Sequence, residues 1–287
     1  MGPRVLTVGD NVVDTYPQQS VMYPGGNAVN VAVHVRRLGV DSGYVGAVGD
    51  DTAGRLILSA LQAEQVDTTR LRVREGANAY AVVEIVEGNR VFTEGHLGVS
   101  VFTLDELDLK AAADVDLVHT GECSHLEDQL GDLAGVARRL SFDFSERDWD
   151  YIEQHAGHVS VAIRSSPDGD LEHALAQAER LRALGPSTVA VTMGDRGALV
   201  LQERPTYRPA PAGRVVDTLG AGDAFIARLL VALVREEQPV EDVLASATAY
   251  ATASCASFGA FGYAAPTDQT SIPLPEQPSR PDRLETS

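Results

Sequence analysis

The chain has 287 residues, of which 44% are hydrophobic, so it is long enough to bury the core of one large α/β domain. Its formal net charge of −18 argues against a nucleic-acid or membrane surface, where clusters of Lys and Arg are expected. Lys110 is the only lysine and no Gly-Lys-Ser/Thr loop occurs, which excludes a Walker-type phosphate site. Cys123 and Cys255 lie far apart, and without a signal peptide or long apolar segment we expect a cytoplasmic protein with reduced thiols.

Short apolar runs alternate with segments of helical period along most of the chain. The expected strands cover residues 5–8, 43–48, 117–119, 140–143, 159–163 and 189–192, and a short extended run is expected at 213–216. The expected helices cover residues 27–38, 53–63, 128–139, 171–184, 221–235 and 240–256. Alternating strands and helices predict a parallel sheet covered on both faces, with ligands at the carboxyl ends of the strands.

Two further stretches, residues 79–86 and 90–94, alternate apolar and polar residues across a Glu-Gly-Asn turn. With residues 12–13 and 21–22 they predict a small antiparallel sheet beside the main domain. We assign one domain to residues 1–263, with the small sheet at about 12–22 and 79–97. From residue 264 onward, five prolines and little apolar content predict a disordered tail, 264–287.

Near the N-terminus, two carboxylates and two amides gather at the end of one expected strand and the start of one expected helix. Asp10 and Asp14 flank an apolar pair, and Asn27 and Asn30 follow the double glycine at 25–26. Such groups can hydrogen-bond a polyhydroxylated ligand. Each of them can also be a turn or cap residue, and Asn27 fits a helix cap.

The most informative motif is Asp-Thr-Leu-Gly-Ala-Gly-Asp at residues 217–223. Gly220-Ala221-Gly222 stands where a helical pattern begins, so its free backbone N–H groups can bind an anion. Asp223, in the first turn, sets a carboxylate beside that anion hole. This arrangement suits deprotonation of a hydroxyl that attacks phosphorus. The alternative is that Asp223 only complements the helix dipole.

Two other patterns do not have the required spacing. A Rossmann fingerprint needs a third glycine three residues after Gly222, where the chain has Phe225. His119, Cys123 and His125 cluster after a strand but match no standard zinc pattern. We interpret residues 122–125 as a loop at the active-site edge and His119 as a structural residue.

Together the motifs at 217–223 and 25–32 resemble the PfkB, or ribokinase-like, family of carbohydrate kinases, and the resemblance covers residues 5 to about 263. Within the family, residues 9–17, 25–33, 48–51 and 142–145 are most similar to the fructoselysine 6-kinase branch. The resemblance implies a ribokinase-like α/β fold whose small antiparallel sheet is a lid over the sugar and the contact of a homodimer.

The resemblance also implies the roles of individual residues. For a kinase, Asp223 would be the catalytic base, and the hole for the transferred phosphoryl group would be formed by Gly220, Ala221 and Gly222. The residues implied for the sugar are Asp10, Asp14, Gly26 and Asn30, and Arg90 in the lid hairpin is a further candidate whose alternative is an exposed turn arginine. The residues implied for the nucleotide are Thr192, Gly194, Gly197 and Gly259; for the turn at 193–198 the alternative is a plain hairpin. Asp217 falls where the family often binds K⁺.

One departure concerns the metal. Family members commonly carry Asn-x-x-Glu after the strand at 159–163, but residues 164–170 read Arg-Ser-Ser-Pro-Asp-Gly-Asp, which leaves the Mg²⁺ ligands unassigned. We expect an ATP- and Mg²⁺-dependent kinase for the 6-hydroxyl of fructoselysine or another fructosamine. The alternatives are a kinase for fructose or ribose, and a sugar- or nucleotide-binding regulator without turnover.

Overall fold

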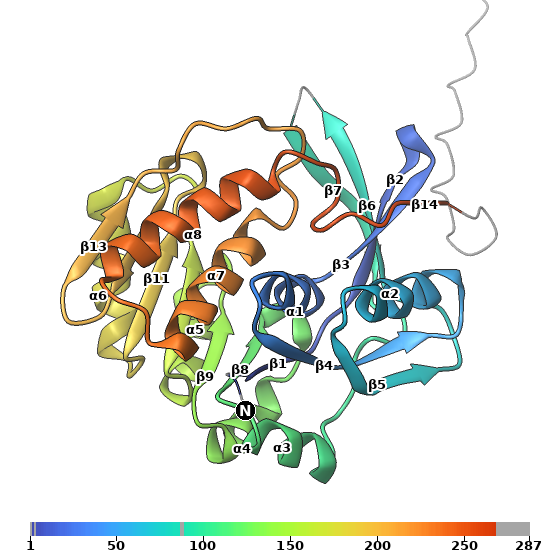
Figure 1. The fold of residues 1–287 in the computed structure, drawn as a ribbon, viewed down its shortest axis with the longest axis horizontal. Helices are drawn as coiled ribbons and strands as arrows, with labels where there is room; N and C mark the ends of the chain where they lie inside the picture. Colours follow the sequence, from blue (N-terminus) through green and yellow to red (C-terminus); the bar gives the residue numbers. More distant parts are fainter. Residues whose placement is uncertain (1, 3, 87–88, 268–287) are drawn as a thin grey trace, which may run out of the picture.

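A computed structural model gives the fold and describes residues 2, 4–86 and 89–267, with no side-chain description for 85–86 and 89–92 (Figure 1). The main sheet of this part of the chain has nine strands. In the order in which they lie, they are β13 (Pro205–Arg208), β12 (Ala198–Leu201), β11 (Thr188–Thr192), β10 (Val161–Ser165), β9 (Leu140–Asp143), β8 (Leu117–Gly121), β1 (Arg4–Val8), β4 (Asp41–Gly49) and β5 (Asp67–Arg74). Neighbouring strands are parallel, except that β12 runs antiparallel to β11 and β13.

Helices cover both faces of this sheet. One face carries α1 (Asn27–Arg37), α2 (Thr52–Ala63), α7 (Ala221–Arg235) and α8 (Val240–Ser254), and the other carries α3 (Glu106–Ala113), α4 (Leu130–Val136), α5 (Trp149–His155) and α6 (Leu171–Ala183). Because side chains alternate along a strand, Val5 of β1 packs with the α1 and α7 side while Leu6 packs with the opposite side. The predicted α/β class, a largely parallel sheet with helices on both faces, is confirmed.

A second, smaller sheet stands at one edge of the domain (Figure 1). Its strands are β14 (Ala265–Pro266), β3 (Val21–Gly25), β2 (Val12–Tyr16), β6 (Tyr80–Val86) and β7 (Asn89–His96). Its pairs are antiparallel as predicted, except that β2 and β6 are parallel. The long connection between β2 and β6 allows this, whereas a hairpin would force antiparallel pairing.

The described chain continues beyond residue 263. Ala265 pairs with Met22 of β3, and the N–H of Thr267 donates to the carbonyl of Ser20 at 3.1 Å. The rest of the predicted tail, 268–287, lies outside the described residues.

Several elements differ from the prediction. The expected helix at 128–139 ends at Val136, and residues 213–216 form no strand. Helix α3 was not predicted because its apolar pattern is weak; a capping box between Asp105 and Asp108 begins it. Strand β5 was not predicted because Arg70 and Arg72 interrupt its apolar pattern, and both pair with Asp105 and Asp108.

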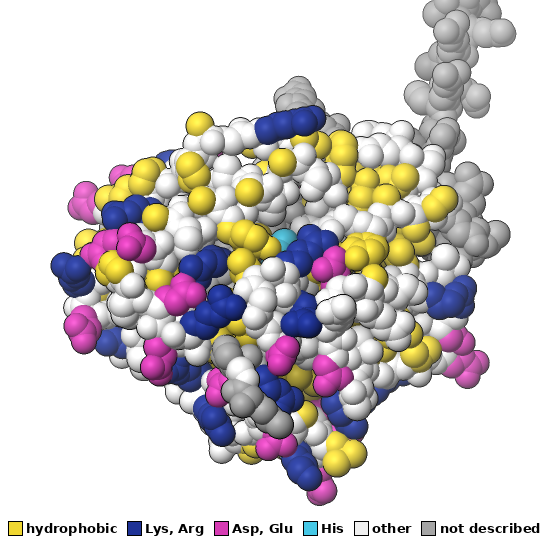
Figure 2. All heavy atoms as spheres, viewed as in Figure 1, with side chains coloured by type: hydrophobic (Ala, Val, Ile, Leu, Met, Phe, Trp, Pro, Cys, Tyr) yellow, Lys and Arg dark blue, Asp and Glu magenta, His cyan; other side chains and the backbone are white. Residues whose placement is uncertain are grey.

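The face shown in Figure 2 carries acidic and basic side chains side by side across its middle and lower parts, whereas hydrophobic and uncharged atoms make up most of its upper part. None of the helices in residues 2, 4–86 and 89–267 is long and apolar enough to span a membrane.

Candidate active site

Polar side chains from four parts of the fold meet at the carboxyl edge of the main sheet. β1 leads into Asp10, and β9 ends at Asp143, which lies in register with the last residue of β8. Helices α1 and α7 pack side by side and begin at the same edge, where α1 carries Asn27 and Asn30 and α7 carries Asp223. The parallel sheet therefore brings together residues from both predicted motifs.

Asp223 turns its carboxylate toward α1. It accepts a hydrogen bond from Asn27 Nδ2 at 2.8 Å and another from Asn30 Nδ2 at 2.7 Å. It makes no capping hydrogen bond to its own helix, whose N-cap is Gly220. The residue as a whole is partly exposed, at the edge of the site. This geometry favours a base over a residue that only complements the helix dipole.

Asn27 joins two carboxylates through one amide nitrogen. Its Nδ2 also donates to Asp143 Oδ2 at 3.0 Å, and its Oδ1 lies 3.0 Å from His119 Nε2. Because the amide nitrogen faces carboxylates, its oxygen must accept from a protonated Nε2, and His119 Nδ1 then accepts from the Ser141 hydroxyl at 3.0 Å. Burial lowers the pKa of His119 to about 3, so the ring is neutral. Asn27 is thus not the helix cap that its position suggested.

The cap of α1 comes instead from Asp10. Its carboxylate accepts from the backbone N–H groups of Asn27 at 2.8 Å and Ala28 at 3.2 Å, and from the Ser124 hydroxyl at 3.2 Å. The residue at the N-cap is Gly26, which has no side chain to do this. Asp10 therefore fixes the helix end that carries Asn27 and Asn30.

The double glycine lets the lid approach this helix end. A Cβ on Gly25 would lie 2.4 Å from Asp14 Oδ2, and one on Gly26, whose φ is +103°, would lie 2.7 Å from Asn11 Cα. Asp14, from β2 of the lid, is buried against this turn with 3% of its surface exposed. Arg90 belongs to β7, and its side chain lies outside the described part of the structure.

The site holds more negative charge than the protein neutralises. Burial raises the pKa of Asp143 to about 7, helped by the charges of Asp223, Glu122 and Asp10. Burial also raises the pKa of Asp223 to about 6 against the effect of its two amide donors, and it raises the pKa of Asp10. Within the described residues, no Arg or Lys forms an ion pair with any of these four carboxylates.

The start of α7 has free donors beside Asp223. The N–H of Ala221 donates to the Thr218 carbonyl at 3.2 Å, whereas the N–H groups of Gly222 and Asp223 have no acceptor among the described residues. A Cβ placed on Gly222 would meet no atom within 4 Å, so the space in front is open. The N–H groups of Gly222 and Asp223 are therefore available to an anion at the start of α7.

The predicted nucleotide residues lie farther along the same sheet edge. Thr192 ends β11, and its Oγ1 lies 3.3 Å from the hydroxyl of Ser165 at the end of β10. Gly194 and Gly197 lie in the turn that joins β11 to the antiparallel β12. Gly197 has a packing role, since a Cβ there would lie 2.1 Å from the Arg208 carbonyl oxygen, while Gly194 faces open space.

Asp217 is held by donors from three segments. Its Oδ1 accepts from the N–H of Leu219 at 3.0 Å, and its Oδ2 accepts from the Tyr16 hydroxyl at 3.1 Å and the N–H of Gly259 at 2.9 Å. Since Tyr16 belongs to the lid, Asp217 links the lid to the 217–223 motif. In the part of the chain that the structure describes, no group of three or more His, Cys, Asp or Glu side chains is placed to hold a metal ion.

The position of the absent Asn-x-x-Glu motif is filled by a packed arginine. Arg164 is 9% exposed; its Nε donates to Gln177 Oε1 at 3.0 Å, and its Nη1 donates to the Arg147 carbonyl at 2.6 Å. Its guanidinium lies 4.9 Å from the Trp149 ring centroid. These contacts hold Arg164 among α5 and α6, on the face of the sheet opposite to α7.

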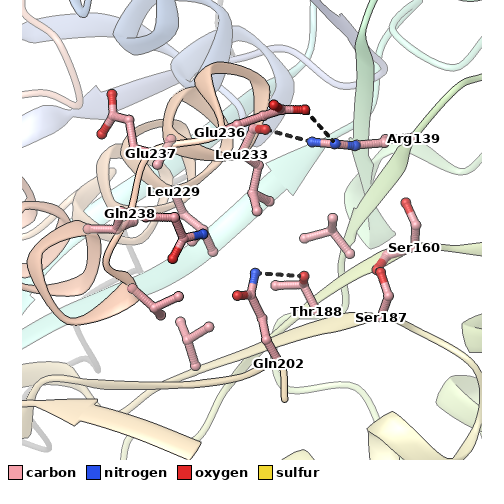
Figure 3. A pocket seen from close by; sticks show the side chains of 15 residues that line it. Arg139, Ser160, Ser187, Thr188, Gln202, Leu229, Leu233, Glu236, Glu237 and Gln238 are labelled. Carbon is pink, nitrogen blue, oxygen red and sulfur yellow. Dashed lines mark hydrogen bonds and ion pairs between the residues drawn. The ribbon is translucent and has the colours of Figure 1, made fainter. Parts of the chain in front are cut away.

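A separate cavity of about 290 Å³ lies at the other end of the sheet (Figure 3). Ser160, Ser187 and Thr188 line it just before or at the start of β10 and β11, and Thr188 accepts a hydrogen bond from Gln202 at 3.2 Å. It is therefore remote from Asp223, which stands at the carboxyl edge.

Three residues of the site were not assigned to it from the sequence. Asn27 was left open between a ligand-binding amide and a helix cap, His119 was interpreted as structural, and Asp143 was noted only as part of a resemblance at 142–145. Asp143 follows a predicted strand, so its place at the carboxyl edge was the signal that could have identified it.

Comparisons with known proteins show the family of the chain. The family model described as pfkB family carbohydrate kinase matches residues 4–267. The fructosamine kinase FrlD of Bacillus subtilis (strain 168) is 37% identical over 270 residues, 92% of this chain and 94% of the relative. The fructoselysine 6-kinase of Escherichia coli (strain K12) is 36% identical over 230 residues, 79% of this chain and 87% of the relative.

Solved structures share the fold. The aminoimidazole riboside kinase of Salmonella enterica, complexed with aminoimidazole riboside and an ATP analog, superposes with a TM-score of 0.73 at 27% identity, covering 90% of this chain and 95% of that chain. Arabidopsis thaliana ribokinase, complexed with ribose and ATP, superposes with a TM-score of 0.78 at 21% identity, covering 94% and 97%.

Proposed function

The chain belongs to the pfkB family of carbohydrate kinases, and from this premise we propose that it transfers the γ-phosphoryl group of ATP to the 6-hydroxyl of fructoselysine or another fructosamine. The observation that carries the proposal is the carboxylate of Asp223, held by two asparagine amides beside two free backbone N–H groups. A base next to an anion hole suits phosphoryl transfer, which depends on positioning and charge stabilisation. The names of the relatives at 36–37% identity support a fructosamine as the acceptor.

In this proposal Asp223 accepts the proton of the attacking hydroxyl. Its pKa of about 6 leaves it ionised at neutral pH, yet closer to the pKa of an efficient base than an ordinary aspartate. The N–H groups at Gly222 and Asp223 stabilise charge on the transferred phosphoryl group, with Gly220 and Ala221 shaping the turn. Removal of the hydroxyl proton as phosphorus approaches gives the sugar phosphate and ADP.

The remaining assignments follow the sheet edge. We assign the sugar to the region bounded by Asp10, Asp14, Gly26 and Asn30, with Arg90 as a further candidate from the lid. The nucleotide extends past Thr192, Gly194, Gly197 and Gly259. The partial exposure of Asp10 and Asp223 supports the first assignment, and the neighbouring ends of β10 and β11 support the second.

ATP would be used with Mg²⁺, which neutralises the phosphate oxygens during transfer. K⁺ at Asp217 stays a prediction, because that carboxylate already accepts from Tyr16, Leu219 and Gly259. Steady-state rates at equal ionic strength in KCl and NaCl test it, and equal rates would remove K⁺ from the proposal.

We also propose that two copies of the chain associate through the lid sheet. Its strands β2, β3, β6 and β7 stand beside the main domain, so they can pack against a second copy without covering the sheet edge. Light scattering of the purified protein tests this, and a monomer at micromolar concentration would contradict it.

The experiment that tests the function is ADP release across a panel of fructose, ribose, fructoselysine and other fructosamines. We expect turnover with fructosamines. Efficient turnover only with fructose or ribose would identify a kinase for a simple sugar. No ADP release with any sugar, combined with binding of sugar or ATP, would identify a regulator.

A further inference from the structure

The position of Asp143 gives the site a second carboxylate close to the base. Asn27 Nδ2 lies 3.0 Å from Asp143 Oδ2 and 2.8 Å from Asp223 Oδ1. The distance between the two carboxylate oxygens therefore cannot exceed the sum of these two distances. Both residues are partly exposed at the carboxyl edge of the sheet. One small ligand can therefore contact both carboxylates.

The side chains named below, which lie around the two carboxylates, are hydrogen-bond acceptors, and none of them carries a positive charge. Asp10 accepts from the N–H of Asn27, whose side chain donates to Asp143. Glu122 directly follows Gly121, which pairs with Asp143. Asn30 is 3% exposed, and its Oδ1 has no donor among the described residues although its Nδ2 binds Asp223. This oxygen is enclosed by protein, so it adds an unpaired acceptor behind the site without being open to a ligand.

A positive charge on that ligand would complete the arrangement. No described Arg or Lys pairs with Asp143, whose own partners are the amide of Asn27 and the N–H of Ser145 at 2.9 Å. Sugars carry hydroxyl donors but no charge. A fructosamine carries a secondary amine on C1, which like other alkylamines is protonated at neutral pH.

We propose that Asp143 is a specificity-determining residue whose carboxylate binds the secondary ammonium group of a fructosamine while Asp223 faces the hydroxyl to be phosphorylated. This inference rests on the proposed function. In the furanose ring form, the CH₂ groups that carry the C1 amine and the C6 hydroxyl are attached to C2 and C5, the two carbons that flank the ring oxygen, so one sugar can present the amine to one carboxylate and the hydroxyl to the other. An ammonium–carboxylate hydrogen bond is about twice as strong as a neutral one, and this difference selects against free fructose.

The test uses two nearly isosteric acceptors, 1-deoxy-1-methylaminofructose and 1-O-methylfructose, which differ in charge. For the wild-type protein, kcat/KM for the amine should exceed that for the ether by about thirtyfold or more, the usual effect of losing one partner of a buried charge pair. Asp143→Asn should remove most of this ratio. Asp132→Asn, an exposed aspartate on α4, is the matched control and should keep it.

Several outcomes would overturn the proposal. Equal kcat/KM for amine and ether in the wild type would do so without any variant, even if Asp143→Asn fails to fold. A larger loss of the ratio in Glu122→Gln than in Asp143→Asn would assign the ammonium to Glu122. If the wild type prefers the amine and Asp143→Asn keeps that preference, only the role of Asp143 fails. If fructose and ribose are phosphorylated and neither C1 derivative is, the proposed function itself fails.

Discussion

Replacing Asp223 with Asn tests the role of the base most sharply. The amide keeps the size of the side chain but cannot accept the proton of a hydroxyl, so kcat should fall by about a hundredfold to ten-thousandfold, the usual contribution of a positioned base. Affinity for ATP should hold or improve, because a carboxylate beside the phosphate is removed. If Asp223 only complemented the helix dipole, stability would suffer before turnover.

The structure also predicts how this variant changes stability with pH. The pKa of Asp223 is raised from 3.8 to about 6 on folding, so the folded state holds the proton more tightly than the unfolded state. Its contribution is therefore favourable at low pH and is lost as pH rises through the folded pKa. By pH 8 the carboxylate destabilises the folded protein by about 3 kcal/mol.

Asparagine at position 223 removes this pH-dependent contribution to the free energy of unfolding. Its side chain has only one oxygen to accept from two donors, the amides of Asn27 and Asn30. An amide without its partner costs about 1–3 kcal/mol at any pH. The variant should therefore be less stable than the wild type at pH 4 and gain up to about 3 kcal/mol relative to it by pH 8.

Steady-state rates, calorimetric ATP binding and urea unfolding at pH 4 and 8 measure these effects on the same variant. The exposed Asp132→Asn serves as the control for a carboxylate lost elsewhere. Turnover within tenfold of the wild type would refute the base assignment. A stability difference that does not change with pH would refute the argument from burial.

Two further predictions follow from the contacts of the site and the lid. In the wild type the amide of Asn27 donates to Asp223 and lowers its pKa, so Asn27→Ala should raise that pKa, lower kcat and move the rising limb of the pH–rate profile to higher pH. A limb that stays in place would show that Asn27 does not tune the base. Truncation after Thr267 should change the free energy of unfolding by less than about 1 kcal/mol and leave turnover intact. Truncation after Tyr263 also removes β14 and should destabilise the protein more. Equal stabilities of the two truncated forms would mean that β14 adds nothing to the lid.

The parallel sheet and the two motif helices were predictable because their signals are local. Apolar runs alternate with helical periods, and α7 begins at Ala221 as its glycine pair suggested. Strand β5 was missed because Arg70 and Arg72 break its pattern, and what makes them compatible with a strand is their pairing with Asp105 and Asp108, far along the chain.

The roles of Asn27 and Asp143 depended on tertiary structure. Asn27 stands in the first turn of a helix after a double glycine, where a cap is the ordinary interpretation. Its partners Asp143, His119 and Asp223 come from β9, β8 and α7, and only the strand order and the packing of α1 on α7 bring them together. No spacing in the sequence carries that information.

The proposed function is tested most directly by the ratio of kcat/KM for fructoselysine to that for free fructose, with the product identified by NMR. We expect a ratio of at least about a hundredfold, because groups of the site left unpaired by the smaller sugar penalise its transition state. We also expect the phosphate to be attached to O6. Equal kcat/KM for the two sugars, or a phosphate on another oxygen, would contradict the proposed function.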